Sequence, residues 1–188
     1  TGLGGQGDID IKPGVNGCIV RSNTVSRTVT TGSTCGAVIA APNCEVYGNF
    51  FHDTDKDGTG DWGFGIYVNG EGDGTGNGVQ VTGTYIHHNS ISNNPAAGIR
   101  LLATVANSLV IARVEQNTIQ NNDIGIEVRT ANGRVVIAQL CDNAFSGNSG
   151  GNVVNIGGSG EVSTNSNCVG IVGQATGTVT ATGTIQWR

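Results

Sequence analysis

One pattern of hydrophobic and polar positions recurs along the chain. Two apolar residues enclose an asparagine in the order apolar-x-x-Asn-x-apolar, in the segments 20–25, 46–51, 86–91, 114–119 and 140–145. The asparagines of these segments, 26, 40, 28 and 26 positions apart, are Asn23, Asn49, Asn89, Asn117 and Asn143. A weaker sixth copy places Gly170 27 positions after Asn143. Recurrence at a nearly fixed period indicates one structural unit that is repeated along the chain.

A glycine marks a second point of each repeat. Gly36, Gly65, Gly98 and Gly125 each begin a short run that contains alternating apolar residues. The long interval of 40 positions contains two insertions rich in glycine and acidic residues, at 53–62 and 69–78. We expect both insertions to be loops on one face of an otherwise ordinary repeat.

The local pattern favours strands over helices. Ile124, Ile126 and Val128 alternate with other residues, which is the period of a strand. Glycine and asparagine interrupt the chain roughly every six to ten residues, too often for helices of useful length. Since one repeat cannot bury its apolar side alone, we predict an all-β solenoid of about 6–7 coils with a shared core. An asparagine at the same point of each coil can tolerate a left-handed backbone and can bond its neighbours along the stack.

The chain is predicted to form a single domain, residues 1–188. Its core coils are expected in about residues 14–175. The ends, 7–12 and 178–188, are expected to be terminal strands because their apolar residues alternate. Such strands can close their own solenoid or join a second copy end to end, and excision of the chain from a longer protein is a third interpretation.

Two segments carry a resemblance to a known family. IHHNSISNNPAAGIRL (86–101) and VEQNTIQNNDIGIEVR (114–129) resemble repeats of the pectate-lyase-like superfamily of right-handed parallel β-helices. The resemblance covers roughly residues 14–175 and implies a single-stranded right-handed parallel β-helix. Solenoids of this kind carry many activities, so the resemblance predicts the fold and not the function.

The cysteines provide a test of the repeat register. Cys18 and Cys44 each lie five positions before a repeated asparagine. The matching positions of the next three repeats should extend this inward column of small residues and are Thr84, Ala112 and Ala138. Cys141 and Cys168 lie one period apart with outward parity, and we predict that they form a disulfide. Cys18 and Cys44 are expected either to form a second disulfide or to stack as buried thiols. Two alternatives remain: Cys35 pairs with Cys44, or all five cysteines are reduced and serve as small core residues.

Composition restricts the partners. The net charge is −5, with a sequence pI of about 4.9, so the chain has no electrostatic footprint for nucleic acid. No apolar run reaches membrane-spanning length. Neutral polysaccharides remain as partners, and polyanionic ones require a cation. Disulfides would fit an extracellular or cell-surface location.

The first insertion resembles a calcium loop. In DTDKDGTGDW, Asp53, Asp55, Asp57, the Thr59 carbonyl and Asp61 match ligand positions of EF-hand, dockerin and thrombospondin-type loops. The position where such loops carry a bidentate carboxylate is occupied by Phe64, so a further ligand would come from Glu71, Asp73 or water. We expect calcium in a structural role, and the alternative is a solvated turn.

Outward columns beside the repeated asparagines supply candidate site residues. Catalytic candidates are His87, Glu115 and His52, because a histidine beside a carboxylate can transfer protons. Glycan-contact candidates are Trp62, Tyr47, Phe50 and His88. A gathering near the insertions on one flank is predicted for Phe50, His52, Trp62, His87, His88 and Glu115. The G-H-G and R-I-K strings of polygalacturonase-like hydrolases are absent from the sequence. The alternative interpretation is that these candidates are ordinary polar residues on the outside of a solenoid, without a functional role.

The sequence therefore favours a structural or adhesive extracellular protein. We expect self-association through the terminal strands into a filament, with calcium and disulfides as stabilising elements. The alternatives are a polysaccharide lyase or hydrolase, or a fragment of one, and a noncatalytic glycan-binding module.

Overall fold

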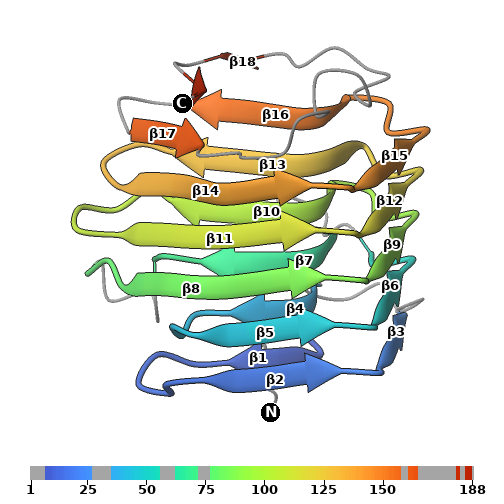
Figure 1. The fold of residues 1–188 in the computed structure, drawn as a ribbon, viewed down its shortest axis with the longest axis horizontal. Helices are drawn as coiled ribbons and strands as arrows, with labels where there is room; N and C mark the ends of the chain where they lie inside the picture. The colour runs from blue at the N-terminus through green and yellow to red at the C-terminus, as the bar shows by residue number, and fades with distance from the viewer. Residues whose placement is uncertain are drawn as a thin grey trace.

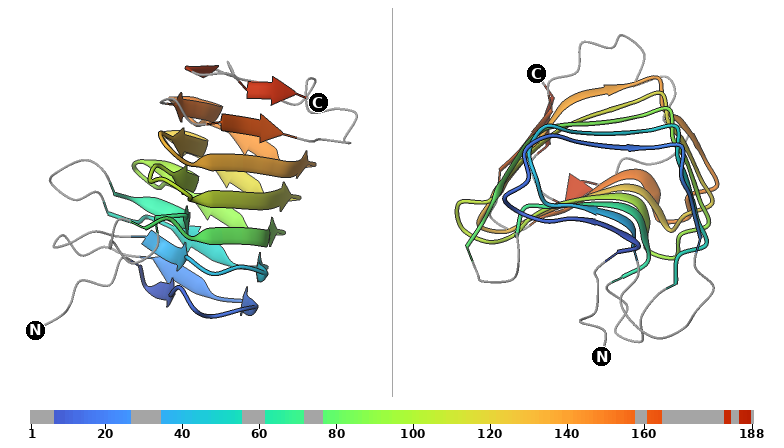
Figure 2. Two further views of the ribbon diagram at one scale, coloured as in Figure 1. Left: turned by 90° about the vertical axis from the view of Figure 1, so that its left-hand side faces the viewer. Right: turned by 90° about the horizontal axis from the view of Figure 1, so that it is seen from below.

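The chain winds into an all-β parallel solenoid (Figure 1). The computed structural model describes residues 7–26, 35–55, 62–71, 77–157, 161–164, 181–182 and 185–187. Every strand pair in these ranges is parallel, and each strand pairs with its counterparts in neighbouring turns. The superposed turns are visible in the right-hand view of Figure 2.

Three sheets, here called A, B and C, run along the solenoid. Sheet A contains β1 (Ile9–Ile11), β4 (Cys35–Ile39), β7 (Phe64–Asn69), β10 (Ala97–Ala103), β13 (Ile124–Thr130), β16 (Gly151–Gly157) and β18 (Ala181–Thr182). Sheet B contains β2 (Cys18–Arg21), β5 (Cys44–Tyr47), β8 (Gln80–His87), β11 (Leu109–Glu115), β14 (Arg134–Cys141), β17 (Glu161–Thr164) and β19 (Ile185–Trp187). Sheet C contains β3 (Thr24–Ser26), β6 (Phe50–His52), β9 (Ser90–Ser92), β12 (Thr118–Gln120) and β15 (Ala144–Ser146).

The number of turns is smaller than the sequence predicts. Sheet C has five strands in the described part of the chain, so about five turns contain all three strands, against the predicted 6–7. The predicted sixth repeat, 167–172, lies outside the described residues. Sheets A and B each contain two further strands that follow β15 in the chain: β16 and β18 in sheet A, and β17 and β19 in sheet B.

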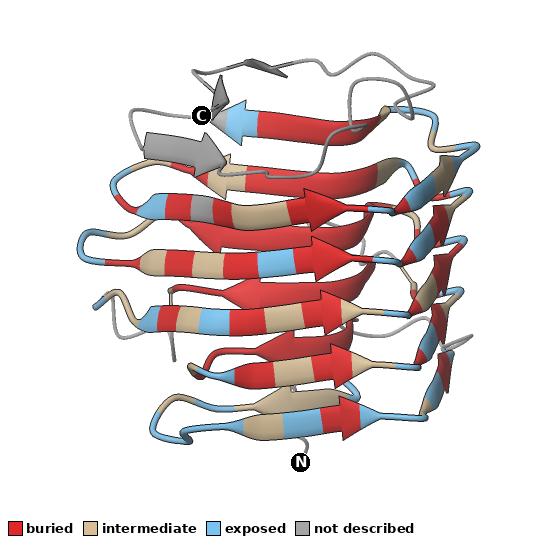
Figure 3. Ribbon diagram, in the orientation of Figure 1, coloured by how far each residue is buried: buried red, intermediate tan, exposed pale blue. Residues whose placement is uncertain are grey.

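The core runs through the middle of the stack, as predicted. The first apolar position of the repeat pattern is at most 5% exposed in all five copies: Val20, Val46, Ile86, Val114 and Leu140. The second is at most 9% exposed in Val25, Phe51, Ile91 and Ile119. Figure 3 shows buried residues alternating with more exposed ones along the strands of sheet B, whereas the strands of sheet A are buried almost throughout.

A ladder of asparagine side chains joins sheet B to sheet C in every turn. Asn49 Nδ2 donates to Asn89 Oδ1 at 2.9 Å, and the same bond repeats between the other neighbours of the series. From Asn49 onward, each amide also donates to a carbonyl of the preceding turn, as Asn89 does to Val46 at 2.9 Å. Buried amides are therefore satisfied along the stack, which confirms the predicted bonding.

The repeated asparagines do not themselves use the left-handed backbone that their residue type tolerates. The left-handed residue is the one before each asparagine, with φ between 52° and 61°: Ser22, Gly48, His88, Gln116 and Asp142. This preceding residue makes the bend from sheet B into sheet C. The asparagine is thereby left with its side chain directed into the stack, where its amide reaches both neighbouring turns.

A second ladder, which the sequence analysis missed, follows sheet C. Asn94 Nδ2 donates to Asn122 Oδ1 at 2.9 Å, and Asn122 Nδ2 donates to Asn148 Oδ1 at 3.1 Å. Thr54 holds the equivalent place one turn earlier and donates its hydroxyl to Asn94 at 2.9 Å. The residue before each member again has a positive φ, namely Asp53, Asn93, Asn121 and Gly147.

The repeated glycines are explained by close packing. A Cβ on Gly65 would lie 2.6 Å from Cγ2 of Ile91 and 2.8 Å from the carbonyl oxygen of Gly98. Both distances are too short for real atoms, so only glycine fits where the chain enters sheet A. Gly36, Gly98 and Gly125 have equivalent obstructions.

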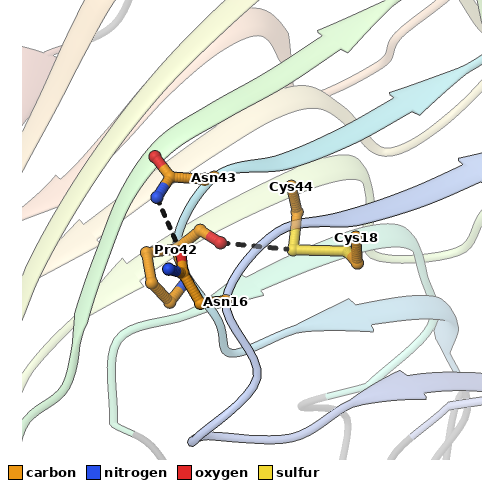
Figure 4. Close-up of a disulfide and its surroundings, with 5 residues drawn as sticks. All are labelled: Asn16, Cys18, Pro42, Asn43 and Cys44. Atoms are coloured by element: carbon orange, nitrogen blue, oxygen red, sulfur yellow. Dashed lines mark hydrogen bonds between the residues drawn. A yellow bond between two sulfur atoms is a disulfide. The ribbon is translucent and has the colours of Figure 1, made fainter.

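The cysteines pair partly as predicted. Cys18 and Cys44 form a disulfide between directly paired positions of β2 and β5, with Cα atoms 4.4 Å apart (Figure 4). Cys35 is buried with a free thiol, so the alternative of a Cys35–Cys44 bridge is wrong, as is that of five reduced residues. Cys141 is disulfide-bonded. Its predicted partner, Cys168, lies outside the described residues.

The column of small residues ends earlier than predicted. Cys44, Thr84 and Ala112 are each 1% exposed, as expected. Ala112 then pairs with Ile137 rather than Ala138, because the register between β11 and β14 shifts after Ala112. One extra residue in β14 moves Ala138 away from the core.

The terminal segments belong to the solenoid. β1 pairs with β4, which confirms the predicted strand at the N-terminal end. The C-terminal tail is not one strand, because β18 pairs with β16 of sheet A and β19 pairs with β17 of sheet B.

Candidate functional site

The outer face of sheet B presents two columns of side chains in register. One runs through Arg21, Tyr47, His87, Glu115 and Cys141, as the sequence predicts. The other lies two residues earlier on each strand and runs through Ile19, Glu45, Tyr85, Arg113 and Gln139. Residues two apart on a strand point to the same side, so the columns share one face. The sheet B surface is defined here as Arg21, Glu45, Tyr47, Tyr85, His87, His88, Arg113 and Glu115.

Four side chains of this surface form a continuous stack. The rings of Tyr47 and His87 are stacked with centroids 5.1 Å apart, and His87 stacks on Tyr85 at 4.0 Å. The guanidinium of Arg113 also lies over the ring of Tyr85, 4.5 Å from its centroid. Arg21 extends the row by donating to the hydroxyl of Tyr47 at 3.2 Å.

Glu115 anchors one end of the stack. Its Oε2 accepts from the hydroxyl of Tyr85 at 2.9 Å, and its Oε1 accepts from Nη2 of Arg113 at 3.0 Å. The residue is only 7% exposed, and a buried carboxylate requires such partners. Burial, followed by the hydrogen bond to Glu115 and its charge, raises the pKa of Tyr85, which Arg113 opposes. The Tyr85 hydroxyl therefore remains a donor at neutral pH.

His87 lies at the centre of the stack and has two polar partners. Its Nε2 is 2.9 Å from Oε1 of Glu45, and its Nδ1 is 2.8 Å from Nδ1 of His88. Because a carboxylate only accepts hydrogen bonds, Nε2 must carry a proton. The His87 side chain is 12% exposed, whereas that of Glu45 is 41% exposed.

The arrangement provides a rigid polar surface. The rings cover one another's faces, and polar groups fix their edges: the Tyr47 hydroxyl is bonded to Arg21, and the His87 nitrogens contact Glu45 and His88. Glu45 and Arg113 add partly exposed polar groups on either side. Such pre-positioned donors and acceptors can bind hydroxyl-rich ligands with little loss of side-chain entropy.

The structure brings only some of the predicted residues together. His87, Glu115, Tyr47 and His88 share the sheet B surface. The expected gathering on one flank is wrong for the others: Phe50 and His52 stack at 4.0 Å on sheet C, while Trp62 packs 5.8 Å from Tyr67 of sheet A. These residues are close in the sequence pattern, but they lie on different sheets of the solenoid and are therefore separated in space.

Three site residues were missed by the sequence analysis: Glu45, Tyr85 and Arg113. Their signal is present in the repeats, since each lies two positions before a residue of the predicted outward column. Extending that column by one strand period would have found them.

The structure describes only residues 53–55 and Trp62 of the predicted calcium loop at 53–62. Asp53 has a φ of 51°, and its Oδ2 is 2.5 Å from Nδ1 of His52. Asp57, Thr59 and Asp61 lie outside the described residues. Within the described ranges, no group of three or more His, Cys, Asp or Glu side chains is placed to hold a metal ion. Calcium binding thus stays a prediction.

The strand between the two insertions, β7, lies in a buried part of sheet A. Arg100 of β10 is 3.0 Å from Oε2 of Glu127 and lies over the ring of Phe64 at 3.8 Å. Burial, as the main cause, raises the pKa of Tyr67 beyond its ordinary range. These outward-facing side chains are at most 8% exposed, so they form a second packed layer and not an open site.

Comparison with protein-family models, curated proteins and solved structures finds no match for this chain. The described part of the chain has no helix with the length and apolar character required to cross a bilayer.

Proposed function

We propose that the protein is an extracellular adhesive β-solenoid that binds neutral polysaccharide through the sheet B surface. The observation that carries this proposal is the stack of Tyr47, His87, Tyr85 and Arg113 with its polar edges on a rigid sheet. The segments 86–101 and 114–129 resemble in sequence the repeats of the pectate-lyase-like superfamily, which includes polysaccharide-active proteins, and this resemblance supports the ligand class.

The charge pattern of the surface favours a neutral ligand. Arg113 is paired with Glu115, and Glu45 is hydrogen-bonded to His87. Only Arg21 is bound to an uncharged partner, the Tyr47 hydroxyl. With a net charge of −5 for the chain, a polyanion would be repelled more than attracted.

The geometry of the surface suits an extended ligand. Neighbouring strands of a sheet are about 4.8 Å apart, a spacing similar to the length of one sugar ring. A polysaccharide that crosses the strands therefore meets new polar groups at each turn. The row begins with Arg21 on β2 and ends with Arg113 on β11.

Adhesion is a better explanation than turnover. The two strongest catalytic candidates are both engaged: Glu115 is buried under Arg113 and Tyr85, and His87 lies between two tyrosine rings. Neither is left open to a reacting bond. The Cys18–Cys44 disulfide supports an oxidising, extracellular setting. Calcium in the loop at 53–62 and end-to-end assembly into filaments are further parts of this proposal.

Affinity electrophoresis with neutral glucans, mannans and galactans tests the proposal. Tyr47→Ala and Arg113→Ala should each weaken binding at least about tenfold, because each removes part of the stack. Phe50→Ala is the matched control, since it removes an aromatic side chain from sheet C and should leave binding unchanged. Equal loss in all three variants, or release of reducing sugars by the wild-type protein, would contradict adhesion through sheet B.

A further inference from the structure

Two histidine nitrogens of the sheet B surface lie unusually close together. Nδ1 of His87 is 2.8 Å from Nδ1 of His88. The centroids of the two rings are 5.1 Å apart. This is about the sum of the distance between the two nitrogens and the radii of the two rings, which is the largest separation that the contact allows. The two nitrogens therefore lie nearly on the line between the rings and point at each other.

This geometry permits a single proton between the rings. A neutral imidazole carries a hydrogen on one nitrogen and a lone pair on the other. Nε2 of His87 is committed to Glu45 as a donor, so Nδ1 of a neutral His87 is an acceptor and Nδ1 of His88 donates to it. If His87 becomes charged, the roles reverse, and His88 accepts. When both rings are charged, two N–H groups face each other and the hydrogen bond is lost.

A metal ion does not explain the pair as well as a proton does. Two ligands of one metal direct their lone pairs to a common point beside the line that joins them, whereas these nitrogens point along that line. In the parts of the chain that the structure describes, these residues also belong to no group of three potential ligands.

We propose that His87 and His88 form a proton-operated switch: on acidification the contact between them breaks, His88 leaves the sheet B surface, and polysaccharide binding weakens. The weakened binding, but not the proton sharing, rests on the proposed adhesive function. The first proton leaves the pair closed, and the second forces the rings apart.

The surroundings determine which ring moves. The groups that face the pair are Glu45 and Tyr47 of β5, Tyr85 of β8, and Arg113 and Glu115 of β11. Glu45 and the two tyrosine faces stabilise a charged His87 in its place. Arg113 is neutralised by Glu115, so its charge is a smaller influence on the pair. His88 is exposed at the bend into sheet C, so its ring is the one that turns away.

The nitrogen chemical shifts of the imidazole rings, followed by NMR between about pH 8 and pH 4, test the proton sharing directly. We expect two coupled steps for His87 and His88, with loss of the Nδ1–Nδ1 contact at the second. His88→Gln preserves the fold, because Gln116 occupies the equivalent left-handed position one turn later. In this variant His87 should titrate in a single step. Independent single steps for both rings in the wild-type protein would overturn the inference.

Binding measurements test the consequence. The wild-type protein should bind a neutral polysaccharide at least about tenfold more weakly at pH 5 than at pH 7.5, and His88→Gln should lose most of this difference. Equal pH dependence in both proteins would overturn the switch. If no polysaccharide binds at any pH, the adhesive function fails, whereas the NMR titration still decides whether the histidines share one proton.

Discussion

Asn89 Nδ2 donates a hydrogen bond to Oδ1 of Asn117 at 2.9 Å, although the residues are 28 positions apart in the sequence. Oδ1 of Asn89 accepts in turn from Asn49 of the previous turn. The ladder thus links successive turns through side chains in the same direction as the backbone bonds of the sheets. It explains how a chain with few charges and few aromatics maintains a single register.

Replacement of Asn89 by alanine should destabilise the solenoid strongly. The change leaves the amide of Asn49 and the carbonyl of Val46 buried without their partners. We expect the free energy of unfolding to fall by about 3 kcal/mol, as is typical for several buried unsatisfied groups. Denaturant unfolding followed by circular dichroism measures the loss. Asn132→Ala, at an exposed turn, is the control, and a similar loss there would show that the ladder has no special role.

The fold could be predicted largely from the sequence, because each turn repeats the same pattern. The inward apolar columns and the outward column of Arg21, Tyr47, His87 and Glu115 follow from strand parity and the repeat period alone. The bends could not be assigned in the same way. Both an asparagine and the residue before it tolerate a left-handed backbone, and only the ladder decides which one adopts it.

The candidate site was less predictable than the fold. Tyr85 and Arg113 matter because their side chains stack across turns, and a contact of this kind depends on rotamers that no repeat pattern specifies. Conversely, Phe50 and Trp62 look like glycan-contact residues in the sequence but lie on other sheets. The sequence pattern predicts whether a side chain points into or out of the solenoid. It does not predict which sheet carries the side chain, because this depends on where the chain bends.

Cys35 should be unreactive in the folded protein. It is 1% exposed, and burial, as the main cause, raises the pKa of its thiol well above the ordinary range. The reactive thiolate is therefore scarce even at pH 8, and access is blocked as well. A thiol reagent should label Cys35 only after denaturant is added. Labelling of native protein at the rate of a free cysteine would contradict the buried position.

Reduction of the Cys18–Cys44 disulfide should lower the stability. A disulfide that closes a loop of this length typically contributes about 3 kcal/mol. Thermal unfolding of the Cys18→Ala variant should show the loss without reductant, and Cys35→Ala in the same assay separates the loss of a bridge from the loss of a buried thiol. An unchanged melting temperature in Cys18→Ala would contradict a stabilising role.

Glu115 should control the ionisation of Tyr85. Burial is the largest cause of the raised pKa of Tyr85, and the hydrogen bond and negative charge of Glu115 raise it further, so Glu115→Gln should shift the titration of this phenol to lower pH. Ultraviolet absorbance gives the titration, and a Tyr85→Phe spectrum subtracts Tyr47 and Tyr67. Glu45→Gln is the matched control and should cause a smaller shift, since the charge of Glu45 raises the pKa of Tyr85 less than Glu115 does. Equal shifts in both variants would show that the hydrogen bond to Glu115 does not raise the pKa of Tyr85.

Calcium should stabilise the protein if the loop at 53–62 binds it. Calcium at about 100 times its dissociation constant adds about 2.7 kcal/mol to the free energy of unfolding. Thermal unfolding with calcium, with magnesium and with a chelator measures the effect, and Asp55→Asn should reduce the response to calcium. Identical melting temperatures in all three conditions would leave the loop as a solvated turn.

The most direct test of the adhesive surface is an NMR titration of backbone amides with a neutral oligosaccharide that binds the protein. We predict that the shifted amides lie along β5, β8 and β11, around Tyr47, His87 and Arg113, with little change on sheet C. Shifts centred on Phe50 and His52, or at the ends of the solenoid, would contradict the account.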